Sequence, residues 1–442
     1  MIEKIFGLQK AQTTLQREIA GGLTTFMTMA YIIFVQPAVL GAVGMDREAV
    51  MVATCLSSAF ATFLMAFLAN YPIALAPAMG HNFFFAYTVV LTLKYSWQQA
   101  LGAIFISGVL FIVVSFVGLR ERLVNTIPST LKNGIAAGIG LLIAVVGLEW
   151  AGIVVYHPGT LVSMGKLSSP PVLLSLFGLT VMAILLALGM RSAILLGILA
   201  TFIVGLMTDM VSYGGIIGPV PSIKPTFFKL DIMGALETGM LSIVFVFFFL
   251  ALFDTVGTLI GVSQEAGLLQ PDGTLPRARQ ALLSDAIGTV SGALLGTSTV
   301  TCYIESATGV SAGARTGLAN IMTGLMFLLA IFFAPLVKMI GGGMKVGEGL
   351  VLYPIIAPAL IIVGCFMLKN ISQINWNDFG EAIPAFLTII LMPFTFSITE
   401  GISFGFISYT LLKTVQGKIK EVPLLVSGFA ILFLIRYIFL SV

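Results

Sequence analysis

Long apolar runs are the feature that most constrains this sequence. Segments of roughly 17–25 residues, long enough to cross a bilayer as helices, recur almost from one end of the chain to the other. Only 9% of the 442 residues are charged, whereas a soluble globular chain has about 25%. Residues 1–442 are therefore predicted to form one polytopic helical membrane domain, and the net charge of +3 gives no indication of a nucleic-acid partner.

Fourteen membrane spans are predicted from these runs. Their limits are 18–40, 49–69, 73–93, 98–117, 130–150, 171–189, 192–211, 236–262, 278–295, 297–314, 318–340, 348–368, 382–397 and 400–415. With the N-terminus inside, fourteen Lys and Arg residues lie on the inner side and seven on the outer side. By the positive-inside rule, both termini of this fourteen-span core face the cytoplasm. Met1–Arg17 is polar and basic, so we expect no cleavable signal peptide.

One further run leaves two alternatives open. Residues 424–440 are apolar and long enough for a marginal fifteenth span. Arg436 within the run and Tyr437 beside it suit a helix at the membrane surface equally well.

Two of the predicted spans are interrupted, at corresponding places in the two halves of the chain. The third span breaks at 74–82, which contains Pro77 and Gly80, and the tenth breaks at 297–305. Seven spans per half is an odd number, so the second half must be inverted relative to the first. Interrupted segments at matching places in two halves indicate the binding site of a transporter.

Glu305 stands where the tenth span changes from a Thr- and Val-rich extended stretch to a helical one. Irregular backbone at mid-membrane depth survives only when it is buried in protein or lines a cavity. An acid there costs roughly 2.5–3.5 kcal/mol on insertion scales, so it is a functional candidate. Free N–H groups at the start of the half-helix would stabilise its carboxylate. The alternative is an acid that only caps its own helix.

Asp254 lies in the apolar segment 245–261, with no basic residue within nine positions on either side. Without a cationic partner, a carboxyl group in this environment is a plausible proton carrier. The alternative is a carboxylate hydrogen-bonded to a neighbouring Ser or Thr for packing alone. Asp285 also lies within a predicted span, and the sequence assigns it no role.

Two residues beside the first break are further candidates. Asn82 would start the other half-helix, where its side chain either caps the helix or offers a donor and an acceptor to a ligand. His81 is either a proton site or a residue that faces away from the site.

Several functional classes are disfavoured by what the sequence lacks. It contains no ATP-binding loop, no nucleophile elbow and no His or Cys metal cluster. Cys55, Cys302 and Cys365 lie singly in apolar segments, and we expect them to be buried thiols. We therefore expect no enzyme, no cofactor and no metal, and transport driven by an ion gradient or by the substrate's own gradient.

Five stretches of this sequence resemble the nucleobase:cation symporter-2 superfamily, in its AzgA-like purine permease branch. The stretch at 296–317 is specific to the branch, and together the five span nearly the whole chain. They are Thr25–Pro37, Ala76–Asn82, Phe253–Val262, Gly296–Gly317 and 392–401.

The resemblance implies a fold and a mode of action. The fold is all-α, with two inverted seven-span repeats and two short antiparallel strands that meet at mid-membrane in spans 3 and 10. Members of the superfamily are often dimers that work by an elevator motion, and we expect a homodimer. The implied core domain covers 14–120 and 234–340, and the implied gate domain covers 121–233 and 341–442.

The resemblance also implies site residues. Matched by motif, the acids that line the base-binding site are Asp254 and Glu305, and the Asn of the third span is Asn82. The sequence departs from the branch at His81, where an apolar residue is expected, and at Phe83, which is often smaller. These departures bear on substrate preference and pH dependence, and leave the class unchanged.

The predicted function is proton-coupled uptake of a purine nucleobase, guanine/hypoxanthine or adenine, across the bacterial cytoplasmic membrane. Glu305 would accept hydrogen bonds from the base, and Asp254, with His81 as a second candidate, would carry the proton; sodium is the less expected ion. Stacking surfaces or backbone hydrogen-bonding groups are expected at Tyr31, Phe83, Phe253, Gly80 and Ile304. The alternatives are a nucleobase facilitator without ion coupling, a xanthine/uracil symporter, or an anion permease, which the lack of an unpaired Lys or Arg at mid-depth disfavours.

Overall fold

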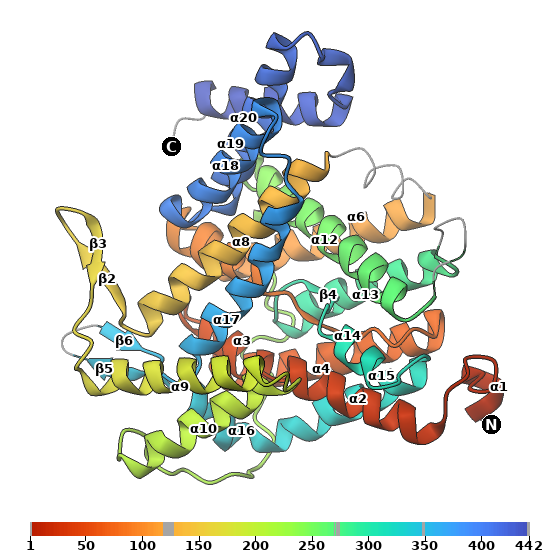
Figure 1. Ribbon diagram of the computed structural model, residues 1–442, viewed down its shortest axis with the longest axis vertical. Coiled ribbons are helices and arrows are strands. Elements are labelled where there is room, and N and C mark those ends of the chain that lie inside the picture. The colour runs from red at the N-terminus through yellow and green to blue at the C-terminus, as the bar shows by residue number, and fades with distance from the viewer. Residues whose placement is uncertain (1, 118–127, 269, 271–274, 347–349, 440–442) are drawn as a thin grey trace. The chain divides into compact units, whose positions relative to one another are not determined.

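The computed structural model describes residues 2–117, 128–268, 270, 275–346 and 350–439, and most of them are helical (Figure 1). They divide into two compact units, which are described separately. Unit 1 comprises Met1–Gly118 and Glu149–Ala359, and unit 2 comprises Leu119–Leu148 and Leu360–Val442. The functional division into a core and a gate domain stays a prediction.

The first part of unit 1 contains helices that are repeatedly interrupted. In chain order the elements are α1 (Ile2–Phe6), α2 (Leu15–Met29), α3 (Ile32–Gly41), α4 (Arg47–Leu64), the π-helical η1 (Met65–Ala69), β1 (Leu75–Pro77), α5 (Met79–Phe83), the π-helical η2 (Phe84–Thr92) and α6 (Trp97–Val117).

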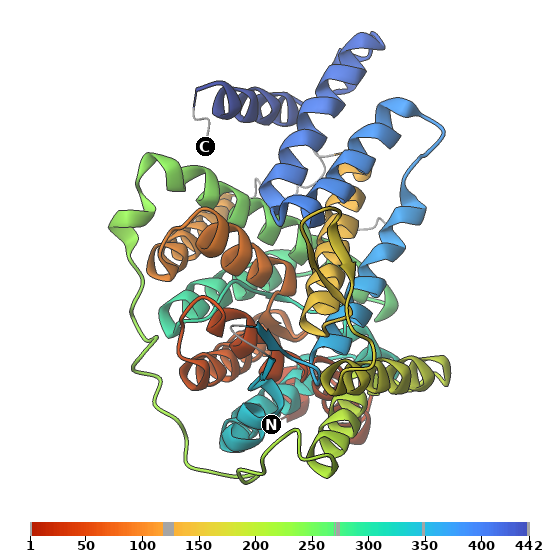
Figure 2. The same cartoon turned by 90° about the vertical axis from the view of Figure 1, so that its left-hand side faces the viewer.

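The second part of unit 1 begins with a hairpin, coloured yellow in Figure 1, and contains the other interrupted helix. The loop 208–231 joins α10 to α11 and has no helix or strand, as the long light-green trace in Figure 2 shows. The elements are β2 (Val154–His157), β3 (Leu161–Met164), α9 (Pro170–Ala187), α10 (Ala193–Met207), α11 (Ile232–Ala235), α12 (Thr238–Glu265), α13 (Ala278–Leu295), β4 (Val300–Cys302), α14 (Ser306–Ser311), α15 (Gly317–Ala330), the 3-10 helix η3 (Ile331–Phe333), α16 (Ala334–Gly341), β5 (Met344–Val346) and β6 (Leu350–Leu352).

Unit 2 is built on helices that pack through small residues. A Cβ added at Gly138 of α8 would lie 3.0 Å from the carbonyl oxygen of Thr388 in α18, which is tighter than most Cβ contacts, so glycine favours this close approach. The elements are α8 (Ser129–Trp150), α17 (Ala357–Met367), the 3-10 helix η4 (Leu368–Gln373), α18 (Phe379–Thr395), α19 (Ile398–Val415), the 3-10 helix η5 (Ile419–Glu421) and α20 (Leu424–Phe439). The last residues of α8 and the first residues of α17 belong to unit 1.

Among the described residues, seven helical segments are long and apolar enough to cross a membrane. They are Leu15–Gly41, Arg47–Ala69, Trp97–Ser115, Ser129–Trp150, Pro170–Ala187, Gly239–Glu265 and Gly317–Gly341. The predicted continuous span 18–40 is two helices that meet at Ala30 and Tyr31. Apolar composition alone does not reveal such a break, because both halves remain apolar. The count of fourteen spans stays a prediction.

The two predicted interruptions meet in space. β1 and β4 form an antiparallel pair in which Leu75 faces Cys302 and Pro77 faces Val300. The backbone N–H of Tyr303 donates to the carbonyl of Ala74 at 3.0 Å and extends the pairing. This contact confirms the two short strands predicted in spans 3 and 10. Because the strands are antiparallel, α5 begins beside the start of β4, and α14 begins beside the start of β1.

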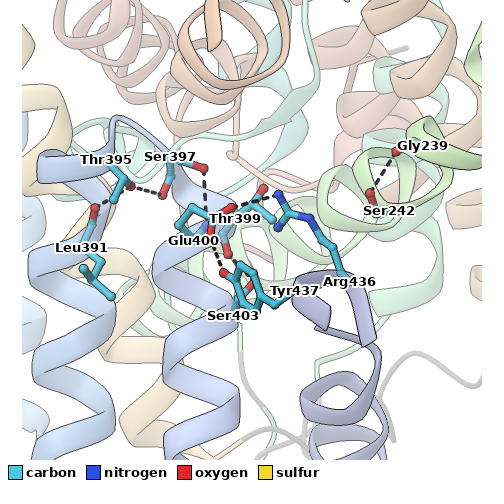
Figure 3. Close-up of polar contacts among 10 residues, drawn as sticks. All are labelled: Gly239, Ser242, Leu391, Thr395, Ser397, Thr399, Glu400, Ser403, Arg436 and Tyr437. Atoms are coloured by element: carbon cyan, nitrogen blue, oxygen red, sulfur yellow. Dashed lines mark hydrogen bonds and ion pairs between the residues drawn. The ribbon is translucent and has the colours of Figure 1, made fainter. Parts of the chain in front are cut away.

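The uncertain C-terminal run is a helix packed on α19 within unit 2. Arg436 of α20 donates to Oε1 of Glu400 at 2.9 Å, and the hydroxyl of Tyr437 donates to the other carboxylate oxygen (Figure 3). Phe406, two turns further along α19, contacts Phe429 and Phe433, so the two helices are antiparallel. Residue 440 lies outside the described residues. Whether α20 spans the membrane stays open.

One expectation about the cysteines is wrong. Cys55 and Cys302 are buried as expected, but Cys365 is exposed on α17. An apolar helix that borders lipid is apolar on its outer face too, so the sequence does not tell which of its residues point inward.

Candidate functional site

Glu305 lies at the junction between β4 and α14. It occupies the position that precedes α14, but its side chain makes no capping bond to that helix. Instead, Oε1 accepts a hydrogen bond from the hydroxyl of Tyr31 at 2.8 Å. Tyr31 is 1% exposed and lies at the break between α2 and α3. The carboxyl group is therefore held by a residue from the other half of the chain.

Asp254 projects from α12 toward the same junction. The hydroxyl of Thr301 in β4 donates to Oδ2 of Asp254 at 3.2 Å. The side chain of Asp254 is 45% exposed, so it is accessible to a ligand or to water. Thr301, which contacts Asp254, lies four residues before Glu305 in the segment that runs from β4 to α14. The structure thus brings together the two acids that the sequence singles out.

His81 lies behind Asp254. Its Nδ1 is 4.0 Å from Oδ2 of Asp254, and the residue is 2% exposed. Its other ring nitrogen, Nε2, is buried and has no hydrogen-bond partner among the described residues. A neutral imidazole offers one donor and one acceptor nitrogen. His81 is therefore placed to exchange a hydrogen bond with Asp254 after a small movement.

One face of α12 beside these acids is open. Asp254, Gly257 and Gly261 are three and four residues apart and so lie on the same face of the helix. Among the described residues, a Cβ added at Gly257 would meet no atom within 4 Å, and one added at Gly261 would meet only the Cδ1 atom of Ile304, at 3.8 Å. Ile304 is itself 56% exposed, next to Glu305. The two glycines therefore leave this face of α12 without side chains at these positions.

Other candidate residues are placed differently. Asn82 is fully buried, and its Oδ1 accepts a hydrogen bond from the hydroxyl of Ser298. Phe83 is also fully buried, and its ring stacks on Tyr87 with centroids 5.6 Å apart. Gly80, in α5, is partly buried. The structure does not bring the side chains of Asn82 and Phe83 to an exposed surface, so their roles toward a ligand stay predictions.

Phe253 lies in α12, but its side chain is outside the described residues. Its stacking role therefore stays a prediction.

Two neighbours of the acids were not assigned from the sequence. Thr301 contacts Asp254 directly, and the buried Asp285 contacts both α12 and β4. The alternation of Thr297, Thr299 and Thr301 is a strand pattern of period two that could have indicated Thr301. No local pattern marks Asp285, because its partners are distant in sequence.

The site offers carboxyl groups as hydrogen-bond acceptors, and no Lys or Arg side chain of the described residues is paired with them. Within the described parts of the chain, neither Asp254 nor Glu305 forms an ion pair with Lys or Arg. No group of three or more His, Cys, Asp or Glu residues that could hold a metal ion is found in those parts. Carboxyl groups accept N–H hydrogen bonds from a neutral ligand and can exchange protons.

Comparison with known sequences identifies a family and relatives of full length. A family model described as "Permease family" matches residues 16–404. The chain is 43% identical to the adenine permease AdeP of Escherichia coli (strain K12), over all of this chain and 97% of that protein. It is 44% identical to the guanine/hypoxanthine permease PbuG of Bacillus subtilis (strain 168), with both chains fully covered.

A solved structure shares the fold. The transmembrane domain of the cyanobacterial bicarbonate transporter BicA superimposes with a TM-score of 0.63 at 16% identity, covering 88% of this chain and 97% of that domain. At this identity the likeness concerns the fold alone. It confirms the predicted fold class, a mostly helical membrane protein of two inverted repeats, here with the β1–β4 pair at the interruptions.

Proposed function

The chain belongs to the nucleobase:cation symporter-2 family of permeases, and we propose that it takes up a purine nucleobase together with a proton. The family is one of transporters, so the chain is a multi-pass membrane transporter and not an enzyme. The purine class is supported by relatives named for adenine and for guanine/hypoxanthine, each matched over nearly its whole length.

One observation carries the proposal: two carboxyl groups, Asp254 and Glu305, lie together at the junction of two broken helices, without a Lys or Arg partner among the described residues. Ionised carboxyl groups at this place would repel an anionic substrate. A neutral base with N–H donors needs acceptors, which these groups supply.

Glu305 is the proposed acceptor for the base. Guanine presents an N1–H and an amino group side by side, which can donate two parallel hydrogen bonds to one carboxylate. Hypoxanthine presents one of these donors, and adenine would use other edges. Each carboxylate oxygen accepts more than one hydrogen bond, so the bond from Tyr31 leaves capacity for the ligand.

Asp254 is the proposed proton carrier. Its side chain is 45% exposed, and its only ion-pair partner within 4.0 Å among the described residues is His81. It would bind a proton from the outside and release it inside. One charge moved through 100 mV yields about 2.3 kcal/mol. At about 1.4 kcal/mol per tenfold ratio, this supports accumulation of roughly fiftyfold.

The same proposal includes the membrane setting. The chain would lie in the bacterial cytoplasmic membrane with both ends of its fourteen-span core in the cytoplasm, surrounded by lipid and paired as a homodimer. Transport would occur by an elevator motion of the core segments 14–120 and 234–340 against the gate segments 121–233 and 341–442. No cofactor beyond the coupling proton is proposed.

Competition for uptake tests the proposal. Radiolabelled hypoxanthine uptake into cells that express the chain is measured with and without a protonophore, and in sodium-free buffer. Unlabelled adenine, guanine, xanthine and uracil serve as competitors. We expect a purine to compete, the protonophore to abolish accumulation, and sodium removal to have no effect.

The contrary outcomes are distinct. Uptake that equilibrates regardless of protonophore indicates a facilitator without ion coupling. Competition by xanthine or uracil alone indicates a different nucleobase symporter. Uptake that requires sodium indicates that sodium, and not the proton, is the coupling ion.

A further inference from the structure

The β1–β4 pair has two outer edges whose backbone groups are buried. Along a strand, successive N–H and C=O groups point to alternate sides. The groups of Thr299 and Tyr303 bond to the β1 side, so those of Val300 and Cys302 point away from it. At mid-membrane depth no bulk water is available to satisfy them.

Side chains of α13 satisfy the outer edge of β4. The hydroxyl of Thr289 donates to the carbonyl of Val300 at 2.8 Å. The backbone N–H of Cys302 donates to Oδ1 of Asp285 at 3.1 Å. Asp285 and Thr289 are four residues apart, so they lie on one face of α13. This face replaces the missing neighbouring strand.

The related edge of β1 uses a neutral residue for the same purpose. Thr62 of α4 accepts from the N–H of Leu75 at 3.0 Å and donates to its carbonyl at 3.1 Å. A threonine thus suffices to satisfy a buried strand edge in the first half of the chain. Asp285 is fully buried, and a buried ionisable group costs more than a hydroxyl. The presence of an acid at the β4 edge therefore needs a second reason.

The second oxygen of Asp285 supplies that reason. Oδ2 accepts a hydrogen bond from the hydroxyl of Thr255 in α12 at 2.8 Å. Thr255 directly follows Asp254, and adjacent residues on a helix point about 100° apart. Holding Thr255 against α13 therefore sets the rotation of α12 that directs Asp254 toward β4.

The elements that carry Asp254 and Glu305 are thus both bonded to the carboxyl group of Asp285. Through Oδ2, Asp285 fixes the helix that carries Asp254, and through Oδ1 it fixes the strand that leads to Glu305. Thr301 and Cys302 are neighbours in β4, as Asp254 and Thr255 are in α12. The contacts Thr301–Asp254 and Cys302–Asp285–Thr255 therefore form two adjacent cross-links between the same two elements.

We propose that Asp285 is a positioning residue that sets the separation and orientation of Asp254 and Glu305 for binding the purine. The proposal rests on the function proposed above. Asp285 itself is fully buried and would touch neither substrate nor transported proton. Its contribution comes from two hydrogen bonds, rather than from a charge that changes during transport.

Substitution by asparagine separates a role in hydrogen bonding from a role that needs an ionisable group. In Asp285→Asn, the amide oxygen still accepts from the N–H of Cys302, and the amide NH₂ donates to the hydroxyl of Thr255, which can rotate to accept. Both links survive and the ionisable group is lost. Asp285→Ala removes both links, and Thr255→Val removes one of them with almost unchanged side-chain volume. Thr255→Ser retains the hydroxyl and is the matched control.

The experiment uses full-length protein purified in detergent and reconstituted in liposomes. Dissociation constants for radiolabelled hypoxanthine and adenine, melting temperatures and uptake driven by an imposed pH gradient are measured for the wild type and the four variants. We expect Thr255→Val and Asp285→Ala to weaken purine binding at least about tenfold, the effect of one lost bond to a charged group. Thr255→Ser and Asp285→Asn should bind within about threefold of wild type and retain gradient-driven uptake.

Each contrary result is separate. Wild-type affinity in Thr255→Val and Asp285→Ala overturns the proposal. Loss of gradient-driven uptake in Asp285→Asn with intact purine binding also overturns it, because Asp285 would then carry the proton. A fall in melting temperature of Thr255→Val that accounts for its lost binding indicates a purely structural role and also overturns it. Failure of the proposed function appears in the wild type itself, as absence of purine binding.

Discussion

The hydroxyl of Tyr31 donates a hydrogen bond to Oε1 of Glu305 at 2.8 Å, although the two residues are 274 positions apart. Tyr31 lies at the break between α2 and α3, and Glu305 lies at the break between β4 and α14. Two interruptions of the chain, one in each half, therefore meet at one carboxyl group. This contact holds the carboxylate in a single orientation before a ligand arrives.

Tyr31→Phe removes this bond and leaves the ring in place. Since a hydrogen bond to a charged group is worth about 1.5–3 kcal/mol, and an ordered carboxylate binds with less loss of side-chain freedom, we expect purine affinity to fall by about tenfold. Isothermal titration with hypoxanthine measures the change. Tyr71→Phe, at another fully buried tyrosine of unit 1, is the control and should bind as wild type. Unchanged affinity in Tyr31→Phe would contradict the role.

Asp254→Asn should separate binding from energy coupling. The amide cannot carry a proton but still accepts a bond from Thr301. We expect purine exchange across vesicles to continue, while accumulation driven by a proton gradient is lost. Asp209→Asn is the control, since Asp209 has φ of 53° and asparagine tolerates this conformation. Normal accumulation in Asp254→Asn would exclude Asp254 as the proton carrier.

Glu305→Gln should abolish high-affinity binding. Glutamine keeps the size of the side chain, but its NH₂ group faces the N–H donors of the base and cannot accept from them. We expect affinity to fall by at least about a hundredfold, which corresponds to about 2.7 kcal/mol. Glu237→Gln, which changes an acid at the start of α12 that makes no capping bond, is the control. Unaltered purine affinity in Glu305→Gln would count against the site.

Gly257→Leu should block the open face of α12 without harming the fold. A Cβ at Gly257 meets no atom of the described residues within 4 Å, and leucine in place of glycine stabilises a helix interior by up to about 1 kcal/mol. We expect loss of purine binding with an unchanged or raised melting temperature. Gly428→Leu in α20 has the same open surroundings and should leave binding intact. If Gly257→Leu binds normally, the ligand does not occupy this face.

The ion pair between Glu400 and Arg436 should contribute to the stability of unit 2. The pair is largely buried, with side chains 23% and 16% exposed. Because an unpaired buried charge is costly, Arg436→Met and Glu400→Gln should each lower the melting temperature, and the double variant should lose less than their sum. We expect a coupling of about 1–3 kcal/mol by double-mutant cycle. The exposed pair of Lys338 and Glu48 is the control, with a coupling below about 1 kcal/mol.

Much of the candidate site follows from local signals in the sequence. Pro77 and Gly80 mark one interruption, and the run of Thr and Val before Glu305 marks the other. A single acid in a long apolar run stands out because of its desolvation cost, so the amino-acid sequence is enough to select Asp254 and Glu305. The pairing of β1 with β4 confirms the two short strands predicted at these interruptions.

Other parts of the site were not predictable in this way. The prediction that Asn82 starts a half-helix is wrong, because α5 begins at Met79, and the buried side chain of Asn82 accepts a hydrogen bond from Ser298. Tyr31 was expected to stack on a base, and the structure places its hydroxyl on Glu305. Asp285 had no assignment, although it connects the elements of both acids.

The sequence alone determined that this chain is a polytopic helical membrane protein with two interrupted spans and with two isolated acids, Asp254 and Glu305, in its predicted spans, because desolvation makes long apolar runs and isolated charges stand out. Only the tertiary structure decided which side chains share a contact. A membrane helix is apolar on all its faces, so its sequence carries little information on which face points inward. The bonds of Tyr31 to Glu305 and of Asp285 to Thr255 join separate helices, and only packing brings such partners within reach.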